Sequence, residues 1–391
     1  MDLIKTNSNF STHRYFKNLF LSLAIANSKI KFLKSLDLKK FNLLCFSLNF
    51  ILLLGFSSCK KDKIEEPIII SKELKNGILV LNEGLFQLNN SNLAWINLAD
   101  LSISTDFFEQ KAGRNLGDTG NDMKRYGGKI YIVVNVSSTV EVLDAKTGKS
   151  LKQISFLNGN QSKQPRSIAF WGSKAYVTCF DGFVDVIDTN SLEIQSRIPV
   201  GLNPDQLISS SNSIFVSNSG GLNNPVYDST ISVINPQIAQ ETTKIIVGKN
   251  PGGLEIIGNN LFVSVRGNFS SIPAKLKRIN LLTLQIEETY AFKPLILEKM
   301  NDKLLLAYEE NQVIKIGVFD VAANSFNNSN LIDLSSIETL YGIHFESSTN
   351  RIYLTDAKNY TTTGKILEYS VEGNFIREFS VGLNPNSLLF F

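Results

Sequence analysis

A turn with the pattern Gly-x-Asn-Pro recurs along this chain at a nearly constant spacing. Its three copies are "GLNPDQL" at 201–207, "GKNPGGL" at 248–254 and "GLNPNSL" at 382–388. The first two begin 47 residues apart, and the third begins 134 residues after the second, close to three further steps. A fixed period of this size indicates a repeat architecture, in which one unit cannot bury its apolar side alone and stacks against its neighbours.

The unit that is easiest to interpret runs from 164 to 200. Its apolar residues alternate with a period of two, which predicts half-buried strands rather than helices. We expect strands at 166–171, 174–180, 183–188 and 193–200, with tight turns at Gly172-Ser173 and Asp181-Gly182. Four short antiparallel strands in each repeat are typical of a propeller blade.

The same strands recur along the rest of the chain. The second-strand pattern begins at 78, 129, 174, 213, 260, 303 and 351, and the third-strand pattern at 93, 140, 184, 231, 276, 314 and 366. No repeat carries a useful apolar stripe at helical spacing, which excludes a helical solenoid. The sequence therefore predicts an all-β, seven-bladed propeller of four-stranded antiparallel blades over residues 77–391.

The position of the last turn predicts how the ring closes. Elsewhere this turn leads into the first strand of a blade, but at 382 it leads into 386–391, where the sequence stops. The first repeat, from Gly77, has no opening strand of its own. We expect the carboxyl-terminal strand to supply it, so that no edge is left unpaired between the first and last repeats. In these turns we expect Pro to fix φ and Gly to relieve the bend.

The segment "KKFNLLCFSLNFILLLGFSSCKKDK" at 39–63 has the layout of a secretory signal: two lysines, an apolar run and small residues before Cys59. It resembles a bacterial lipoprotein signal, which implies that Cys59 is acylated and inserted in a membrane. An uncleaved transmembrane anchor is the alternative, although the run from 41 to 56 is shorter than the ~20 residues that span a bilayer. We expect a signal segment at 1–58 and a tether at 59–76. The charges next to Cys59 fit either an export tag or a solvated tether.

Charge and composition exclude several classes of protein. The net charge is +3, but residues 1–58 hold eight of the basic residues and two acids, which leaves 31 basic and 34 acidic residues beyond them. That balance argues against a nucleic-acid partner. The three cysteines have no metal-ligand spacing, and Cys179 should be a buried free thiol. His344 is the sole histidine of the propeller region, and we expect it to serve in packing or in a loop.

The stretch 176–207 resembles the YVTN-type, YncE-like repeats of surface propellers, and this resemblance covers most of 77–391. The segments 81–98 and 113–149 are similar to the opening blades of a Bacteroidota family of surface propeller lipoproteins. That family includes cobalamin-capturing proteins that sit on a TonB-dependent transporter. The resemblance implies an outer-membrane lipoprotein exposed at the cell surface. Its expected partners are a small nutrient ligand, for which a corrinoid is one candidate, and an outer-membrane transporter.

In a propeller, the turns before each first strand and the loops between second and third strands lie on one face. The longest polar and aromatic loops of this chain fall there, and such loops on a rigid scaffold commonly bind ligands. Our candidate ligand contacts are Phe86, Asn89, Asp118, Asn121, Tyr227, Arg266, Phe269, Asn359 and Tyr360. Each could instead order its own loop, and Asp118 and Asn121 could hydrogen-bond the turn backbone.

We expect a monomeric, non-catalytic binding protein without a cofactor. The alternative is an enzyme, because some propellers hydrolyse lactones at a rim metal and others hold a quinone. Acids on this face could bind Ca²⁺; they are Glu83, Asp118, Asp181, Glu309 and Asp356. A purely structural surface protein is the third possibility.

Overall fold

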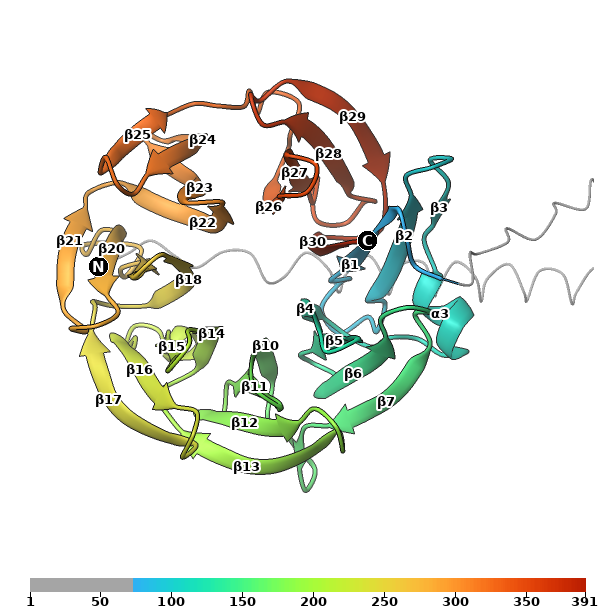
Figure 1. The fold of residues 1–391 in the computed structure, drawn as a ribbon, viewed down its shortest axis with the longest axis horizontal. Coiled ribbons are helices and arrows are strands. Elements are labelled where there is room, and N and C mark those ends of the chain that lie inside the picture. The colour runs from blue at the N-terminus through green and yellow to red at the C-terminus, as the bar shows by residue number, and fades with distance from the viewer. Residues whose placement is uncertain (1–72) are drawn as a thin grey trace, which may run out of the picture. The chain divides into compact units, whose positions relative to one another are not determined.

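The computed structural model describes residues 73–391, and the expected signal segment, Cys59 and most of the expected tether lie outside this range. In the described part the chain forms seven four-stranded antiparallel sheets arranged as a ring (Figure 1). The seven-bladed propeller expected from the repeats is therefore confirmed. No helix of the described residues is long and apolar enough to cross a membrane.

Every blade runs from an inner strand near the axis of the ring to an outer strand. In that order, blade 1 is β30 (Pro385–Phe390), β1 (Gly77–Asn82), β2 (Asn92–Asn97) and β3 (Ile103–Ser104); blade 2 is β4 (Gly120–Tyr126), β5 (Lys129–Val134), β6 (Thr139–Asp144) and β7 (Ser150–Ser155). Blade 3 is β10 (Pro165–Trp171), β11 (Lys174–Cys179), β12 (Phe183–Asp188) and β13 (Glu193–Pro199); blade 4 is β14 (Pro204–Ser209), β15 (Ile214–Asn218), β16 (Thr230–Asn235) and β17 (Gln240–Ile246). Blade 5 is β18 (Pro251–Ile257), β19 (Asn260–Val265), β20 (Lys275–Asn280) and β21 (Ile286–Tyr290); blade 6 is β22 (Lys293–Met300), β23 (Lys303–Glu310), β24 (Val313–Asp320) and β25 (Ser325–Asn328). Blade 7 is β26 (Leu340–Glu346), β27 (Arg351–Asp356), β28 (Lys365–Ser370) and β29 (Phe375–Ser380).

The ring closes as the sequence predicts, because the last strand completes the first blade. Strand β30 pairs antiparallel with β1, with Leu388 opposite Val80 and Phe390 opposite Ile78. The backbone of Phe391 also exchanges hydrogen bonds with that of Gly77. The side chain of Leu388 is buried in a cluster with Val80, Ile366 and Phe379, so residues from blades 1 and 7 share one core.

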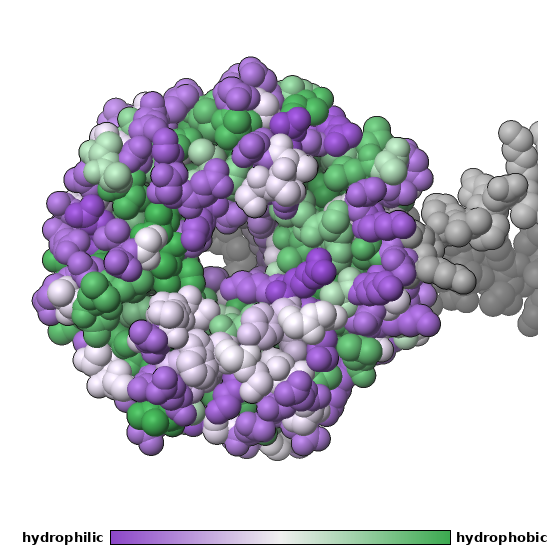
Figure 2. Space-filling view, viewed as in Figure 1, coloured by the Kyte–Doolittle hydropathy of each residue, from purple (hydrophilic) through white to green (hydrophobic). Residues whose placement is uncertain are grey.

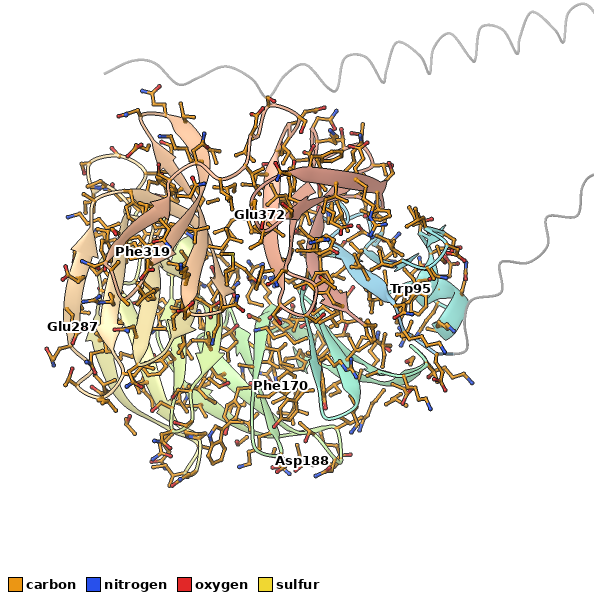
Figure 3. All side chains as sticks on the ribbon, turned by 45° about the horizontal axis from the view of Figure 1, so that its top comes forward. Trp95, Phe170, Asp188, Glu287, Phe319 and Glu372 are labelled. Carbon is orange, nitrogen blue, oxygen red and sulfur yellow. The ribbon has the colours of Figure 1, made fainter. Side chains whose placement is uncertain are left out.

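The apolar core lies between neighbouring blades rather than inside a single sheet. One cluster joins Tyr131 and Val142 of blade 2 to Ile168 and Ala175 of blade 3. At the edge of this cluster Phe170 stacks on Tyr126 of blade 2, with ring centroids 4.4 Å apart. Figure 3 shows side chains filling the spaces between blades, with Phe170 and Phe319 among those labelled. Buried Cys179 belongs to the same cluster and is a free thiol, as expected.

Three small elements interrupt the regular pattern. Helix α3 (Phe107–Ala112) follows the very short β3, and its Phe107 packs on Trp95 of β2 with ring centroids 6.2 Å apart. The strands β8 (Leu157–Asn158) and β9 (Gln161–Ser162) form a hairpin between blades 2 and 3, and the 3-10 helix η2 (Gly221–Asn223) lies between β15 and β16. The sequence did not predict α3, which replaces most of the outer strand of blade 1.

Asparagine shares the role that was expected of glycine in the recurring turn. The residue before each proline takes a left-handed φ, and it is Asn203, Asn250 or Asn384; of the glycines two positions earlier, only Gly248 also has a positive φ. Asparagine tolerates this region better than most residues. The glycine two positions earlier permits a close approach: a Cβ on Gly382 would overlap the side chain of Asn82, whose Oδ1 accepts the Gly382 N–H at 3.0 Å.

Candidate functional site

The first strands of the seven blades surround the axis of the ring, each in contact with the next. Figure 2 shows that the molecule is hollowed at this centre. We use "upper face" for the face that carries the turns before the first strands and the loops between second and third strands. The channel mouth on this face is the candidate site.

A β-bulge near the upper end of every first strand places one extra residue there. In β10 the register shifts between Pro165 and Ile168, and β4, β14, β18, β22, β26 and β30 shift at the same place. A bulge leaves its extra residue unpaired and re-aims its side chain. The bulged positions hold Asn121, Arg166, Asp205, Gly252, Leu295, Tyr341 and Asn386.

Three of these residues, Asn121, Arg166 and Asp205, contact one another from blade to blade. Arg166 donates a short hydrogen bond to Asn121 Oδ1 of blade 2, and its Nε and Nη2 lie 3.4 Å from Asp205 Oδ1 of blade 4. Asn121 Nδ2 in turn donates to the Arg166 carbonyl at 2.8 Å. Asn386 Nδ2 donates to the Gly120 carbonyl at 2.8 Å, which links blade 1 to blade 2.

Glycine at the bulge of blade 5 makes room for an arginine from a loop. A Cβ on Gly252 would overlap Cζ of Arg266, so this guanidinium occupies the space that a side chain at 252 would fill. From there Arg266 Nη1 and Nη2 donate to Asp205 Oδ2 at 3.0 and 3.1 Å. Arg166 and Arg266 thus share one carboxylate. We call Asn121, Arg166, Asp205, Arg266, Tyr341, Asn386 and the adjoining Glu83 the upper ring.

Burial and charge set the protonation of the upper ring. Burial opposes ionisation of Asp205, but the charges of Arg166 and Arg266 outweigh it and lower the pKa of this carboxyl. Burial raises the pKa of Glu83 despite the hydrogen bond that it accepts from Tyr341. Burial and the neighbouring Glu83 raise the pKa of Tyr341. The ring therefore combines two guanidinium groups with one acid whose pKa is lowered and one acid whose pKa is raised.

A lower level of the channel carries a second set of titratable groups. The register places Lys124, Glu255, Glu298 and His344 at equivalent positions of their first strands. Burial, with a further contribution from the charge of Glu255, raises the pKa of Glu298 to about 8. Burial also raises the pKa of Glu255 and lowers that of His344 to about 4.

The expected ligand contacts divide into residues near the mouth and residues that order loops. Asn121 and Arg266 belong to the upper ring. Exposed Tyr360 lies edge-on to Tyr341 at 6.1 Å, and Tyr227 lies edge-on to exposed Phe269 at 6.2 Å. Arg266 and Phe269 also line a pocket of about 470 Å³ with Ile272, Pro273 and Phe292. That volume is in the usual range for a small-molecule site.

The other candidates have local partners. Buried Asp118 accepts the backbone N–H groups of Gln87 and Asn89 at 3.2 Å, and so fixes the loop that carries exposed Phe86. Asn359 Oδ1 accepts the N–H groups of Thr361 and Thr362, which orders its own turn.

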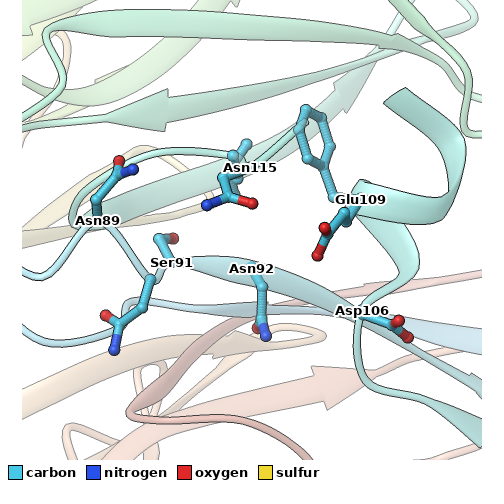
Figure 4. Close-up of a pocket in the computed structure, with 9 residues that line it drawn as sticks. Asn89, Ser91, Asn92, Asp106, Glu109 and Asn115 are labelled. Atoms are coloured by element: carbon cyan, nitrogen blue, oxygen red, sulfur yellow. The ribbon is translucent and has the colours of Figure 1, made fainter. Parts of the chain in front are cut away.

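A smaller pocket of about 220 Å³ lies beside helix α3 (Figure 4). Asn92, the first residue of β2, and Ser91 just before it face Glu109 and Asn115 across the pocket.

The five acids considered for Ca²⁺ do not come together. Across residues 73–391 no group of three or more His, Cys, Asp or Glu side chains is arranged to hold a metal ion. Asp181 pairs with Arg197 at 2.6 Å, Glu309 with Lys293 at 2.6 Å and Asp356 with Lys358 at 2.8 Å. Glu83 and Asp118 have the partners described above.

Sequence reasoning missed Arg166, Asp205, Tyr341 and Asn386. A usable signal existed, because Arg166, Asp205 and Asn386 each follow the proline of a turn. A polar residue at this repeated position is a candidate for the channel wall. Arg266 was found only because its loop is long and polar.

The fold and this channel define the protein as a seven-bladed β-propeller whose last strand closes the ring. A family model described as "Domain of unknown function (DUF5074)" matches residues 76–382, and the chain belongs to this family. The match ends before β30, the strand that completes blade 1. A comparison with curated proteins gave no match.

Solved structures of several kinds share the fold. A quinonprotein alcohol dehydrogenase-like protein from Bacteroides thetaiotaomicron has a TM-score of 0.62 and 13% identity, over 82% of this chain and 79% of the other. Hydrazine synthase from Kuenenia stuttgartiensis has a TM-score of 0.55 and 17% identity, over 68% of this chain and 87% of the other. The computationally designed Ika8 protein has a TM-score of 0.51 and 14% identity, over 80% of this chain and 90% of the other. At these identities the likeness concerns the fold alone.

Proposed function

We propose that this protein is a non-catalytic binding protein that takes a small ligand with an anionic group at the upper mouth of its channel. The observation that carries the proposal is the pair of guanidinium groups of Arg166 and Arg266 on the single carboxylate of Asp205. Arginine presents five donors in a fixed fork, so each of these side chains keeps N–H groups for a carboxylate or phosphate.

The surroundings of the pair support a ligand that also has an apolar or aromatic part. Phe269 is 71% exposed and Tyr360 is 50% exposed on the upper face. The pocket beside Arg266 adds Ile272, Pro273 and Phe292. Small-molecule sites commonly combine such apolar walls with a few well-placed polar groups. A corrinoid, which the family resemblance suggests, is one candidate among ligands of this kind.

We further propose that the propeller is attached to the outer membrane through acylated Cys59 and faces the cell exterior. What supports this is the sequence around Cys59, where lysines, an apolar run and small residues precede the cysteine. In this arrangement the upper face would deliver its ligand to an outer-membrane transporter of the TonB-dependent type.

The test is a thermal-shift screen of the full chain in detergent against corrinoids, haems, glycans and simple carboxylates and phosphates. We expect one class to raise the melting temperature, and Arg266→Gln to abolish that shift. Arg351→Gln is a matched control: both arginines have 38% exposed side chains, and each shares a buried carboxylate with a second arginine. If no class shifts the melting temperature, or if both variants lose the shift equally, the proposal is wrong and a structural role is favoured.

A further inference from the structure

The pocket of about 220 Å³ beside helix α3, which we call the α3 pocket, has two walls. One wall is formed by residues 89–92, at the end of a loop and the start of β2. The other is formed by 106–109 at the start of α3 and by 115–116 beyond its end. The α3 pocket shares no residue with the upper ring. At about 30 Å³ for each water molecule it has room for roughly seven waters, a space comparable to one sugar ring.

The β2 wall offers hydrogen-bond donors. Oδ1 of Asn90 accepts the backbone N–H of Leu85 at 2.7 Å, and Oδ1 of Asn92 accepts Nδ2 of Asn82 at 2.8 Å. These two bonds fix the orientation of both amides. The Nδ2 groups of Asn90 and Asn92 have no partner within residues 73–391. What each side chain has left in full is therefore its pair of N–H donors.

The helix wall offers hydrogen-bond acceptors. The side chain of Glu109 is exposed, and its carboxylate has no partner in the part of the chain that the structure describes. Asp106 Oδ1 accepts Nε2 of Gln110 at 2.8 Å, which leaves Oδ2 of Asp106 available. Ionised carboxylates only accept hydrogen bonds. Among the described residues that line the α3 pocket there is no Lys, Arg or His to neutralise these two acids.

Both walls are held in place by the fold itself. Phe108 lines the α3 pocket, and the guanidinium of Arg114 lies 5.2 Å from the centroid of its ring. Arg114 in turn pairs with buried Glu141 of blade 2 at 2.7 Å. On the other wall, Asp118 accepts the backbone N–H of Asn89 at 3.2 Å. A site whose walls are already ordered loses less conformational entropy when a ligand binds.

The two walls together favour a neutral ligand whose groups both donate and accept. A hydroxyl can accept from Asn90 or Asn92 while it donates to Glu109. A carboxylate or phosphate has no proton to donate and would be repelled by the acids, whereas an ammonium group cannot accept. Phe108 and Leu116 add an apolar part to the wall, which suits the C–H groups of a sugar ring.

We propose that the α3 pocket binds one neutral hexose unit of a carbohydrate. This inference goes beyond the proposed function, because the pocket is separate from the channel mouth and takes a different class of ligand. The hydroxyls of the hexose accept from the asparagines of the β2 wall and donate to the acids of the helix wall. One chain would then carry an anion site at the upper ring and a sugar site at the edge of blade 1.

The first experiment reverses the polarity of the β2 wall. Saturation-transfer-difference NMR titrations of the full chain, in a detergent without a sugar head group, measure the binding of glucose, galactose, mannose and N-acetylglucosamine. We expect at least one of them to bind, and Asn90→Asp to weaken it at least about tenfold. This change keeps the Oδ1 that accepts the Leu85 N–H but replaces the donor by an acceptor. Asn328→Asp is the matched control, because Asn328 is also exposed and its Oδ1 also accepts a backbone N–H, from Asn330 at 2.9 Å.

The second experiment removes the acceptor of the helix wall. Glu109→Ala should weaken the same sugar by about fivefold to tenfold. Glu193→Ala is its control, since Glu193 has a 71% exposed side chain and lies in blade 3. Both controls should leave the affinity within about twofold. Acetate and methylammonium, which offer only acceptors or only donors, should give no signal that Asn90→Asp or Glu109→Ala alters.

The outcomes separate this inference from the proposed function. If none of the four sugars binds, or if binding survives both Asn90→Asp and Glu109→Ala, the inference is wrong. It is also wrong if the two pocket variants remove a signal from acetate or methylammonium but not from a sugar. Arg266→Gln should leave the sugar affinity within about twofold. A sugar that responds to Arg266→Gln and not to the pocket variants lies at the channel mouth, which supports the mouth as a binding site and overturns the α3 pocket.

Discussion

Replacing Glu298 by glutamine should make the propeller more stable, and increasingly so as the pH rises. In the folded chain the pKa of Glu298 is raised from 4.5 to about 8, first by burial and then by the charge of Glu255. Between these two values the folded state binds more protons at this site than the unfolded state. The free energy of unfolding of the parent therefore falls with increasing pH over this window.

The size of this loss of unfolding free energy follows from the folded and unfolded pKa values of Glu298. At 1.36 kcal/mol for each pKa unit, the cost of holding Glu298 in the wall is near zero at pH 4.5, about 3 kcal/mol at pH 7 and about 5 kcal/mol above pH 8. Glutamine cannot ionise, but its Oε1 can still accept the Phe345 N–H that Glu298 accepts at 3.0 Å. The variant should recover most of this free energy without losing that hydrogen bond.

The assay is urea unfolding of parent and variant at pH 4.5, 7 and 9. We expect equal stabilities at pH 4.5 and a gain in the variant of about 2–5 kcal/mol at pH 9. Glu193→Gln is the control, since the Glu193 side chain is 71% exposed, and it should change stability by less than about 0.5 kcal/mol at every pH. A constant difference between parent and Glu298→Gln across the pH range would refute the reasoning.

Three further predictions concern ring closure, the buried thiol and the anchor. Leu388→Ala should lower the free energy of unfolding by about 2–5 kcal/mol in urea titrations, because this buried side chain joins the cores of blades 1 and 7, and deletion of 388–391 should abolish cooperative melting. A deletion variant that melts like the parent would contradict the closure by β30. Cys179 should resist iodoacetamide in the folded chain and react after denaturation, because burial raises the pKa of its thiol well above the usual value; equal labelling rates in both states would oppose this. Cys59→Ser should abolish metabolic labelling with a fatty acid and move the protein out of the membrane fraction, whereas retention there would favour a transmembrane anchor.

The propeller could be inferred from the sequence because the strands of a blade follow one another closely along the chain. Alternating apolar residues and turn residues define β11 and β12 within about 15 positions of chain, and the same pattern occurs seven times. The same local reasoning failed for α3. Its six residues are too few for a convincing helical period, and Phe107 and Phe108 are buried by contacts that the sequence does not display.

The upper ring could not be predicted in this way, because its contacts join residues far apart in the chain. Tyr341 and Glu83 are 258 positions apart, and Arg266 and Asp205 are 61 apart. Loop polarity pointed to Arg266 and Asn121, but it gave equal weight to Asp118 and Asn359, which order loops. Burial and register distinguish these roles, and both belong to the assembled ring.

The sequence by itself determined the number of blades, their strands and the closing role of the last strand, since these depend on short-range periodicity and on an unpaired edge that needs a partner. Only the tertiary structure decided which side chains meet in the channel. A bulge turns one residue of each first strand toward the axis, and seven blades bring those residues together. The pairing of Arg166 and Arg266 on Asp205 arises from that convergence and not from any local pattern.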